Sequence, residues 1–83
     1  MDECFSPEDC NTAICLCGGR DNLKDLECCT TRVRIEVSDL SKVDTNGLED
    51  LPMVKGVWIR RNEVQLVIGL EAIKITSLLK QYL

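Results

Sequence analysis

Hydrophobic and polar residues alternate most clearly from Thr31 to Val37. Every second residue of this segment is apolar, and the apolar set is Val33, Ile35 and Val37. Successive side chains of a strand point to opposite faces, so the segment predicts a strand with one face in a core. Arg32 and Arg34 then project together from the exposed face.

Three other segments have the character of strands. They are Leu23 to Cys28, Val54 to Arg60 and Glu63 to Gly69. Arg61-Asn62 predicts a hairpin turn between the last two, and Val64, Leu66 and Ile68 would share their core face. Cys29 falls at the hairpin that joins the first strand to the alternating one.

Helical spacing occurs near both ends of the chain. Between Pro7 and Cys17 the apolar stripe consists of Cys10, Ala13, Ile14 and Cys17. Ser6 is the expected N-cap and Gly18-Gly19 the stop. Leu70 to Leu83 ends in a second helix, whose stripe is Ile75, Leu78, Leu79 and Tyr82. A short helix capped by Asp44 is predicted to run through Leu48 and Leu51 and to end at Pro52.

The predicted order is helix, two strands, helix, two strands, helix, with short connections. Such connections favour antiparallel hairpins covered by helices. We therefore expect an α+β two-layer sandwich, with an antiparallel four-stranded sheet and three helices on one face. Residues 1–83 are expected to form a single domain.

The composition of the chain limits the classes of function that it can have. A chain of 83 residues has a small core, so an active site is expected on its surface. The net charge of −4 and the scarcity of aromatic residues disfavour nucleic-acid binding. No apolar run has the length of a membrane span and the N-terminus lacks a secretory pattern, which predicts a cytosolic protein with reduced thiols. The absence of histidine excludes Ser-His and Cys-His catalysis within the chain.

The candidate chemistry lies around Cys29, which precedes Arg32 and Arg34 by a few residues. A thiolate is a nucleophile that can accept a phosphoryl group, and nearby cations stabilise the thiolate. Paired guanidinium groups match the charge and shape of a phosphate. The segment therefore predicts phosphoryl carriage.

The segment from Asp25 to Arg34 resembles the phosphorylation-site segment of glucose-type enzyme IIB domains of the bacterial sugar phosphotransferase system. That family has a cysteine, any residue, a threonine, an arginine, any residue and a second arginine. Aligned without gaps, its phosphorylated cysteine falls on Cys29, its threonine on Thr31 and its arginines on Arg32 and Arg34. Further likeness lies at Gly18-Gly19, Asn22-Leu23, Asp39 to Asp44, Lys55 to Val57 and Val64 to Gly69. Cys28, Thr30, Glu63 and Leu51-Pro52 depart from the family pattern.

The resemblance implies a phosphocarrier and phosphotransferase without a cofactor or metal. Cys29 would take a phosphoryl group from a phosphohistidine of enzyme IIA and pass it to a sugar bound by the membrane domain IIC, at the inner face of the membrane. Arg32 and Arg34 would hold the phosphate and Thr31 would donate a hydrogen bond. Thr30 and Gln65 are further candidates for phosphate contacts, and backbone amides of the Cys29–Arg32 hairpin are expected to form an anion nest.

Alternatives remain at this point. Cys28 could be the reactive thiol, although adjacent strand residues point apart and the matched register favours Cys29. The cysteines could form a thiolate metal or redox site, but no Cys-x-x-Cys spacing occurs. The chain could be a regulatory IIB-like binding module that phosphorylates no sugar. The sugar itself is not determined by these residues.

Overall fold

The structure, a computed structural model, describes residues 7–52 and 54–83. Its helices are α1 (Pro7–Leu16), α2 (Thr45–Glu49) and α3 (Ala72–Lys80), and its strands are β1 (Leu23–Cys28), β2 (Arg32–Val37), β3 (Gly56–Arg60) and β4 (Glu63–Val67). Two short 3-10 turns, Arg20–Asn22 and Leu40–Lys42, complete the order. The N-cap expected at Ser6 and the thiol of Cys4 lie outside the described residues.

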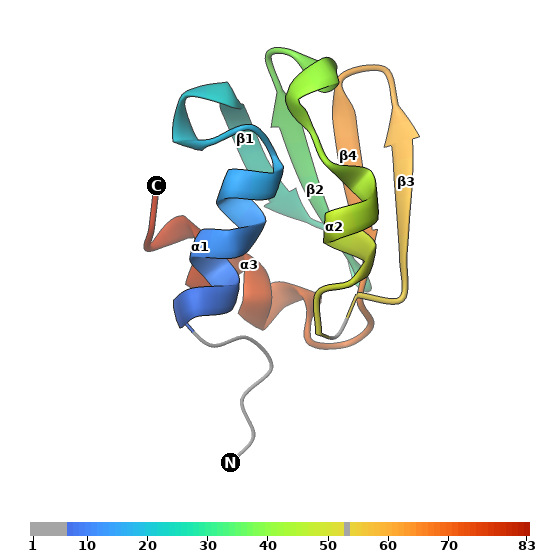
Figure 1. Cartoon of the computed structure of the whole chain (residues 1–83). Helices are drawn as coiled ribbons and strands as arrows, with labels where there is room; N and C mark the ends of the chain where they lie inside the picture. The colour runs from blue at the N-terminus through green and yellow to red at the C-terminus, as the bar shows by residue number, and fades with distance from the viewer. Residues whose placement is uncertain (1–6, 53) are drawn as a thin grey trace.

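The four strands form one antiparallel sheet in the order β1-β2-β4-β3. The helices lie together on one side of it, as Figure 1 shows, and leave the other side open. The predicted α+β sandwich and its element order are therefore confirmed. The two central strands are β2 and β4, which are far apart in sequence.

The core fills the space between the sheet and the helices. It consists of Cys10, Ala13, Ile14, Cys17, Leu26, Val33, Ile35, Val37, Leu48, Leu51, Val64, Leu66, Ile68, Ala72, Ile75 and Leu79. The apolar stripes predicted for β2 and β4 are fully included in this set. Because both central strands bury every second side chain, their remaining side chains line the open face.

The end of α1 shows why the chain turns where it does. The Gly19 N–H donates to the Ile14 carbonyl and the Gly18 N–H to the Cys15 carbonyl, at 2.9 and 3.0 Å. These two bonds form a Schellman motif, which needs the positive φ of 100° that Gly18 adopts. The helix therefore ends at Leu16, one residue before the predicted end at Cys17.

The other boundaries also differ slightly from the prediction. β2 begins at Arg32 rather than Thr31, β3 at Gly56 rather than Val54, and β4 ends at Val67 rather than Gly69. Gly69 has a φ of 120°, which does not fit an extended strand. Asp44 caps α2 as expected, because its Oδ1 accepts a hydrogen bond from the Gly47 N–H at 3.0 Å.

Candidate functional site

The candidate site lies on the open face of the sheet, at the hairpin between β1 and β2. Cys29 is exposed in this hairpin, and its N–H donates to the Arg32 carbonyl at 2.8 Å. Cys28 is the last residue of β1 and pairs with buried Val33, so its side chain lies on the helix-covered side. The two adjacent thiols therefore point in different directions.

Arg34 is the arginine that contacts the thiol. Its Nη1 lies 3.7 Å from the Cys29 Sγ, at hydrogen-bonding distance for sulfur. The Nε of the same guanidinium donates to the Glu63 carboxylate at 3.1 Å. Arg34 thus holds the thiol at one edge of its guanidinium and a carboxylate at another.

Arg32 has a different partner. Its Nη1 donates to the Gln65 Oε1 at 2.9 Å, and the Gln65 Nε2 donates to the Glu63 Oε1 at 2.9 Å. In the register of β2 and β4, each arginine hydrogen-bonds with the residue diagonal to it rather than the one directly opposite. Within residues 7–52 and 54–83, no hydrogen bond joins the Arg32 guanidinium to the Cys29 sulfur. One continuous polar chain therefore links Cys29, Arg34, Glu63, Gln65 and Arg32.

The polar chain also fixes protonation states. The hydrogen bond from Gln65, followed by the hydrogen bond and charge of Arg34, lowers the pKa of the Glu63 carboxyl below its ordinary value. The hydrogen bonds to Cys29 and then to Glu63 raise the pKa of Arg34. At neutral pH, Glu63 is therefore an anion and Arg34 a cation.

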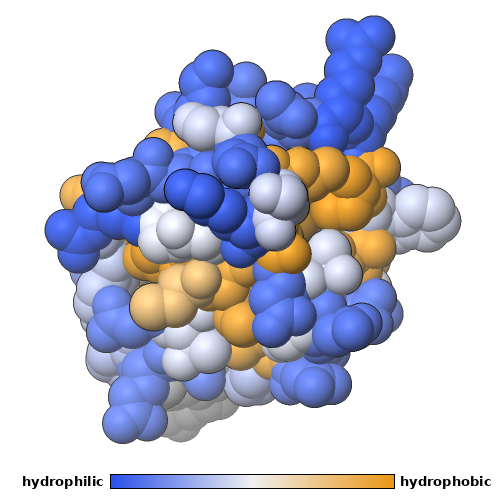
Figure 2. All heavy atoms as spheres, turned by 45° about the horizontal axis from the view of Figure 1, so that its top comes forward, coloured by the Kyte–Doolittle hydropathy of each residue, from blue (hydrophilic) through white to orange (hydrophobic). Residues whose placement is uncertain are grey.

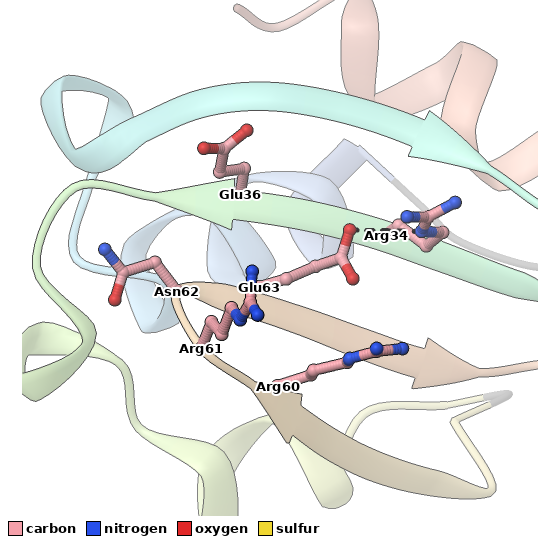
Figure 3. A pocket seen from close by; sticks show the side chains of 6 residues that line it. All are labelled: Arg34, Glu36, Arg60, Arg61, Asn62 and Glu63. Carbon is pink, nitrogen blue, oxygen red and sulfur yellow. Dashed lines mark hydrogen bonds and ion pairs between the residues drawn. The ribbon is translucent and has the colours of Figure 1, made fainter.

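A shallow hollow adjoins this network on the open face. It is lined by Arg34, Glu36, Arg60, Arg61, Asn62 and Glu63. Figure 3 shows the Glu63 side chain reaching from β4 toward Arg34, while Glu36 points away from that pair. A second shallow hollow is lined by Arg32, Trp58, Ile59, Arg60 and Gln65.

The end of the molecule that carries the β3–β4 turn and the 3-10 turns faces the viewer in Figure 2, and hydrophilic residues cover most of it. Hydrophobic residues show between them. The hollow beside Arg61 and Asn62 therefore opens at a largely polar end of the fold.

Thr31 and Thr30 are exposed residues of the hairpin. Thr31 holds the hairpin through its backbone, because its carbonyl accepts the N–H groups of Ile68 and Gly69, both at 2.9 Å. The prediction that the hairpin amides form an anion nest is wrong for the Cys29 N–H. This N–H donates to the Arg32 carbonyl within the hairpin and is not available to an anion.

The other described cysteines are separate from this site. Cys10 and Cys17 are buried in the core, and burial raises the pKa of the Cys17 thiol to about 12. Burial, followed by the charge of Asp9, also raises the pKa of Cys10. Cys15 is exposed on α1, and all five described cysteines are free thiols. In the part of the chain that the structure describes, no group of three or more cysteine or acidic side chains is arranged to hold a metal ion.

Glu63 is the site residue that the sequence did not identify. It counted only as a departure from the family pattern, because no local motif places a carboxylate beside an arginine 29 positions earlier. The pairing of β2 with β4 was the missing information. With that register known, an acidic residue diagonal to Arg34 would have been recognised as its ion-pair partner.

Comparisons with known proteins bear on the family and on the fold. Residues 14–44 match the family model described as phosphotransferase system, EIIB. A crystal structure of one domain of the PTS system IIabc component from Clostridium difficile has a similar fold, with a TM-score of 0.79 and 24% sequence identity. That match covers 89% of this chain and 78% of the other. No helix among the described residues has the length and apolar character needed to cross a membrane.

Proposed function

We propose a function on the premise that this chain is an EIIB domain of a phosphotransferase system, as the family match and the fold together support. An EIIB domain is a phosphocarrier within that system. The proposal is that Cys29 is the residue that carries the phosphoryl group. The single observation that supports it best is the Arg34 guanidinium, whose Nη1 lies 3.7 Å from the Cys29 Sγ on an exposed face.

The transfer can be written in two balanced steps. In the first, the Cys29 thiolate attacks the phosphorus of a phosphohistidine on enzyme IIA, a P–S bond forms, and the P–N bond breaks with its electron pair remaining on the imidazole. In the second, a sugar hydroxyl held by IIC attacks the phosphorus and loses its proton to a base or to water. The P–S bond breaks and the thiolate is restored.

The protein contributes position and charge to both steps. Phosphoryl transfer needs little covalent assistance beyond alignment and neutralisation of the phosphate oxygens. Arg34 is already beside the sulfur, and Arg32 lies two residues earlier on the same face of β2. Arg32 would reach the phosphate by leaving Gln65, and Thr30, Thr31 or Gln65 would supply neutral hydrogen bonds. The exposure of Cys29 allows larger partner proteins to approach it.

The location and partners follow from this role. We expect the domain to work in the cytoplasm, receiving phosphate from IIA and meeting IIC at the inner face of the membrane. No cofactor is required for either step. These 83 residues contain no histidine, which fits a carrier whose phosphohistidine donor lies outside them.

Two cysteine variants test the assignment. The chain is incubated with a purified glucose-type IIA protein that is kept phosphorylated, and the phosphate is located by mass spectrometry. Cys29→Ser should lose the phosphate on the peptide that carries the hairpin, whereas Cys28→Ser should keep it. The reverse result would transfer the role to Cys28. Sugar phosphate formed with IIC membranes only when this chain is present would separate a transport carrier from a regulatory module.

A further inference from the structure

Glu63 is a negative charge inside a site that is proposed to hold phosphate. Its carboxylate bonds the Arg34 Nε at 3.1 Å, while Nη1 of the same guanidinium faces the Cys29 Sγ at 3.7 Å. The Glu63 side chain is 24% exposed and that of Arg34 39%, so solvent only partly screens the pair. One guanidinium therefore contacts both the Glu63 carboxylate and the Cys29 sulfur.

Glu63 also restricts where Arg34 can lie. A free arginine side chain has many rotamers, and an ion pair fixed at Nε leaves Nη1 on the part of the guanidinium that faces the Cys29 sulfur. Gln65 holds the other oxygen of Glu63 and thereby fixes the carboxylate itself. The guanidinium is consequently presented to the hairpin in one orientation.

The same carboxylate opposes a phosphate on Cys29. A phosphoryl group adds a charge of about −1.5 to −2 at neutral pH. Arg34 would then be shared between this group and Glu63, and the two anions would repel each other across it. A carrier must release its phosphoryl group as readily as it accepts it. The negative charge of Glu63 favours release, because it repels the phosphoryl group.

We propose that Glu63 is a positioning residue that orients Arg34 toward Cys29 and weakens the hold of Arg34 on any anion at the sulfur. The effect of Glu63 on the Cys29 thiol is inferred from the contacts of Arg34 alone. Its effect on a phosphoryl group rests in addition on the proposed function. In this view Glu63 sets the balance between keeping and passing on the phosphoryl group.

The chain offers a matched control. Glu36 lies on the same open face, is directly opposite Glu63 in the β2–β4 register and lines the same hollow. Among the described residues it has no hydrogen bond or ion pair with an arginine. Glu63→Gln and Glu36→Gln therefore remove the same charge from the same face, and only the first removes the carboxylate that bonds Arg34.

The first measurement is alkylation of Cys29 by iodoacetamide, followed by peptide mass spectrometry across a pH series. It needs no phosphoryl donor. Glu63→Gln should accelerate alkylation near neutral pH by about two- to five-fold and move the rate profile to lower pH, a range typical of a partly exposed charge pair. Glu63→Ala should accelerate alkylation less than Glu63→Gln does, because Arg34 then also loses the hydrogen-bond acceptor that orients it. Equal alkylation rates in Glu63→Gln and Glu36→Gln would overturn the claim that the Glu63 charge weakens the effect of Arg34 on the sulfur. Equal rates in Glu63→Gln and Glu63→Ala would overturn the claim that Glu63 orients Arg34.

The second measurement is the lifetime of the phosphorylated chain after phosphorylated IIA is removed, followed by intact mass. Glu63→Gln should retain its phosphate about two- to five-fold longer than wild type, while Glu36→Gln stays close to wild type. Unchanged lifetimes would refute the proposal for the phosphoryl group. A wild-type chain that is never phosphorylated would refute the proposed function instead, and the alkylation series would still decide the role of Glu63.

Discussion

Asn22 is a buried polar side chain whose removal should strongly destabilise the fold. It is 4% exposed, and its Nδ2 donates to the carbonyls of Cys17 at 2.7 Å and Asp39 at 3.0 Å. Its Oδ1 accepts the Asp39 N–H at 2.8 Å. One amide thus ties the end of α1 to the connection that follows β2. Asn22→Ala removes all three bonds and leaves their backbone partners without the amide.

The expected magnitude follows from those contacts. Each hydrogen bond is worth about 0.5–1.5 kcal/mol net, and a buried group left unpaired costs about 1–3 kcal/mol. Allowing for water entering the space, we expect Asn22→Ala to lower the free energy of unfolding by about 2–4 kcal/mol. For a domain of this size that corresponds to a fall in Tm of roughly 10–25 °C.

Thermal and urea unfolding followed by circular dichroism would measure this loss. Asn11→Ala is the control, because Asn11 is exposed on α1, and it should change stability by less than about 0.5 kcal/mol. β1 separates Asn22 from Cys29 by roughly 20 Å, so the folded variant should keep wild-type alkylation of Cys29. A loss below about 1 kcal/mol would refute the argument that this amide ties the end of α1 to the connection after β2.

Four further outcomes are expected. Gly18→Ala should cost about 1–3 kcal/mol more than Gly19→Ala in urea unfolding, because its Cβ would lie 2.5 Å from the Asn22 Nδ2 while that of Gly19 meets nothing within 4 Å. Cys17→Ser should cost about 1–3 kcal/mol by burying a hydroxyl, whereas Cys15→Ser on the surface should be nearly neutral in the same assay. Arg34→Lys should slow phosphoryl transfer from IIA by about tenfold or more, since lysine cannot serve Glu63 and Cys29 together, while Arg60→Lys should not. The hydrogen bonds from the Ser41 hydroxyl and then the Ser41 N–H lower the pKa of Asp39. The ionised Asp39 therefore stabilises the fold at pH values above its unfolded pKa of 3.8, and this stabilisation is lost as the pH falls through the lower pKa of the folded state. Asp39→Asn should therefore flatten the acid limb of a stability profile.

Most of the fold was predictable from the sequence because its signals are local. The alternation from Val33 to Val37 specified a half-buried strand, and the stripe from Cys10 to Cys17 specified a helix on a core. Element ends were less predictable. Gly69 and the Gly18-Gly19 pair adopt positive φ, which decides where β4 and α1 end through backbone geometry rather than hydrophobic pattern.

The candidate site was predictable only in part, because its contacts are not local. Arg32 and Arg34 were correctly placed on one face, but only Arg34 contacts the Cys29 sulfur, while Arg32 bonds Gln65. The pairing of β2 with β4 brings Glu63 and Gln65 to the arginines, and no spacing along the chain reveals it. Asn22 shows the same limit, since its burial depends on hydrogen bonds to Cys17 and Asp39, which no local pattern reveals.

The central claim is that the exposed Cys29 beside Arg34 becomes phosphorylated. Peptide mass spectrometry of the chain, trapped during incubation with phosphorylated IIA, tests this most directly. The account predicts the added mass of one phosphoryl group on the thiol of Cys29 in wild type and in Cys28→Ser. An unmodified Cys29, with IIA shown to be phosphorylated and able to charge a known EIIB domain in the same experiment, would contradict it.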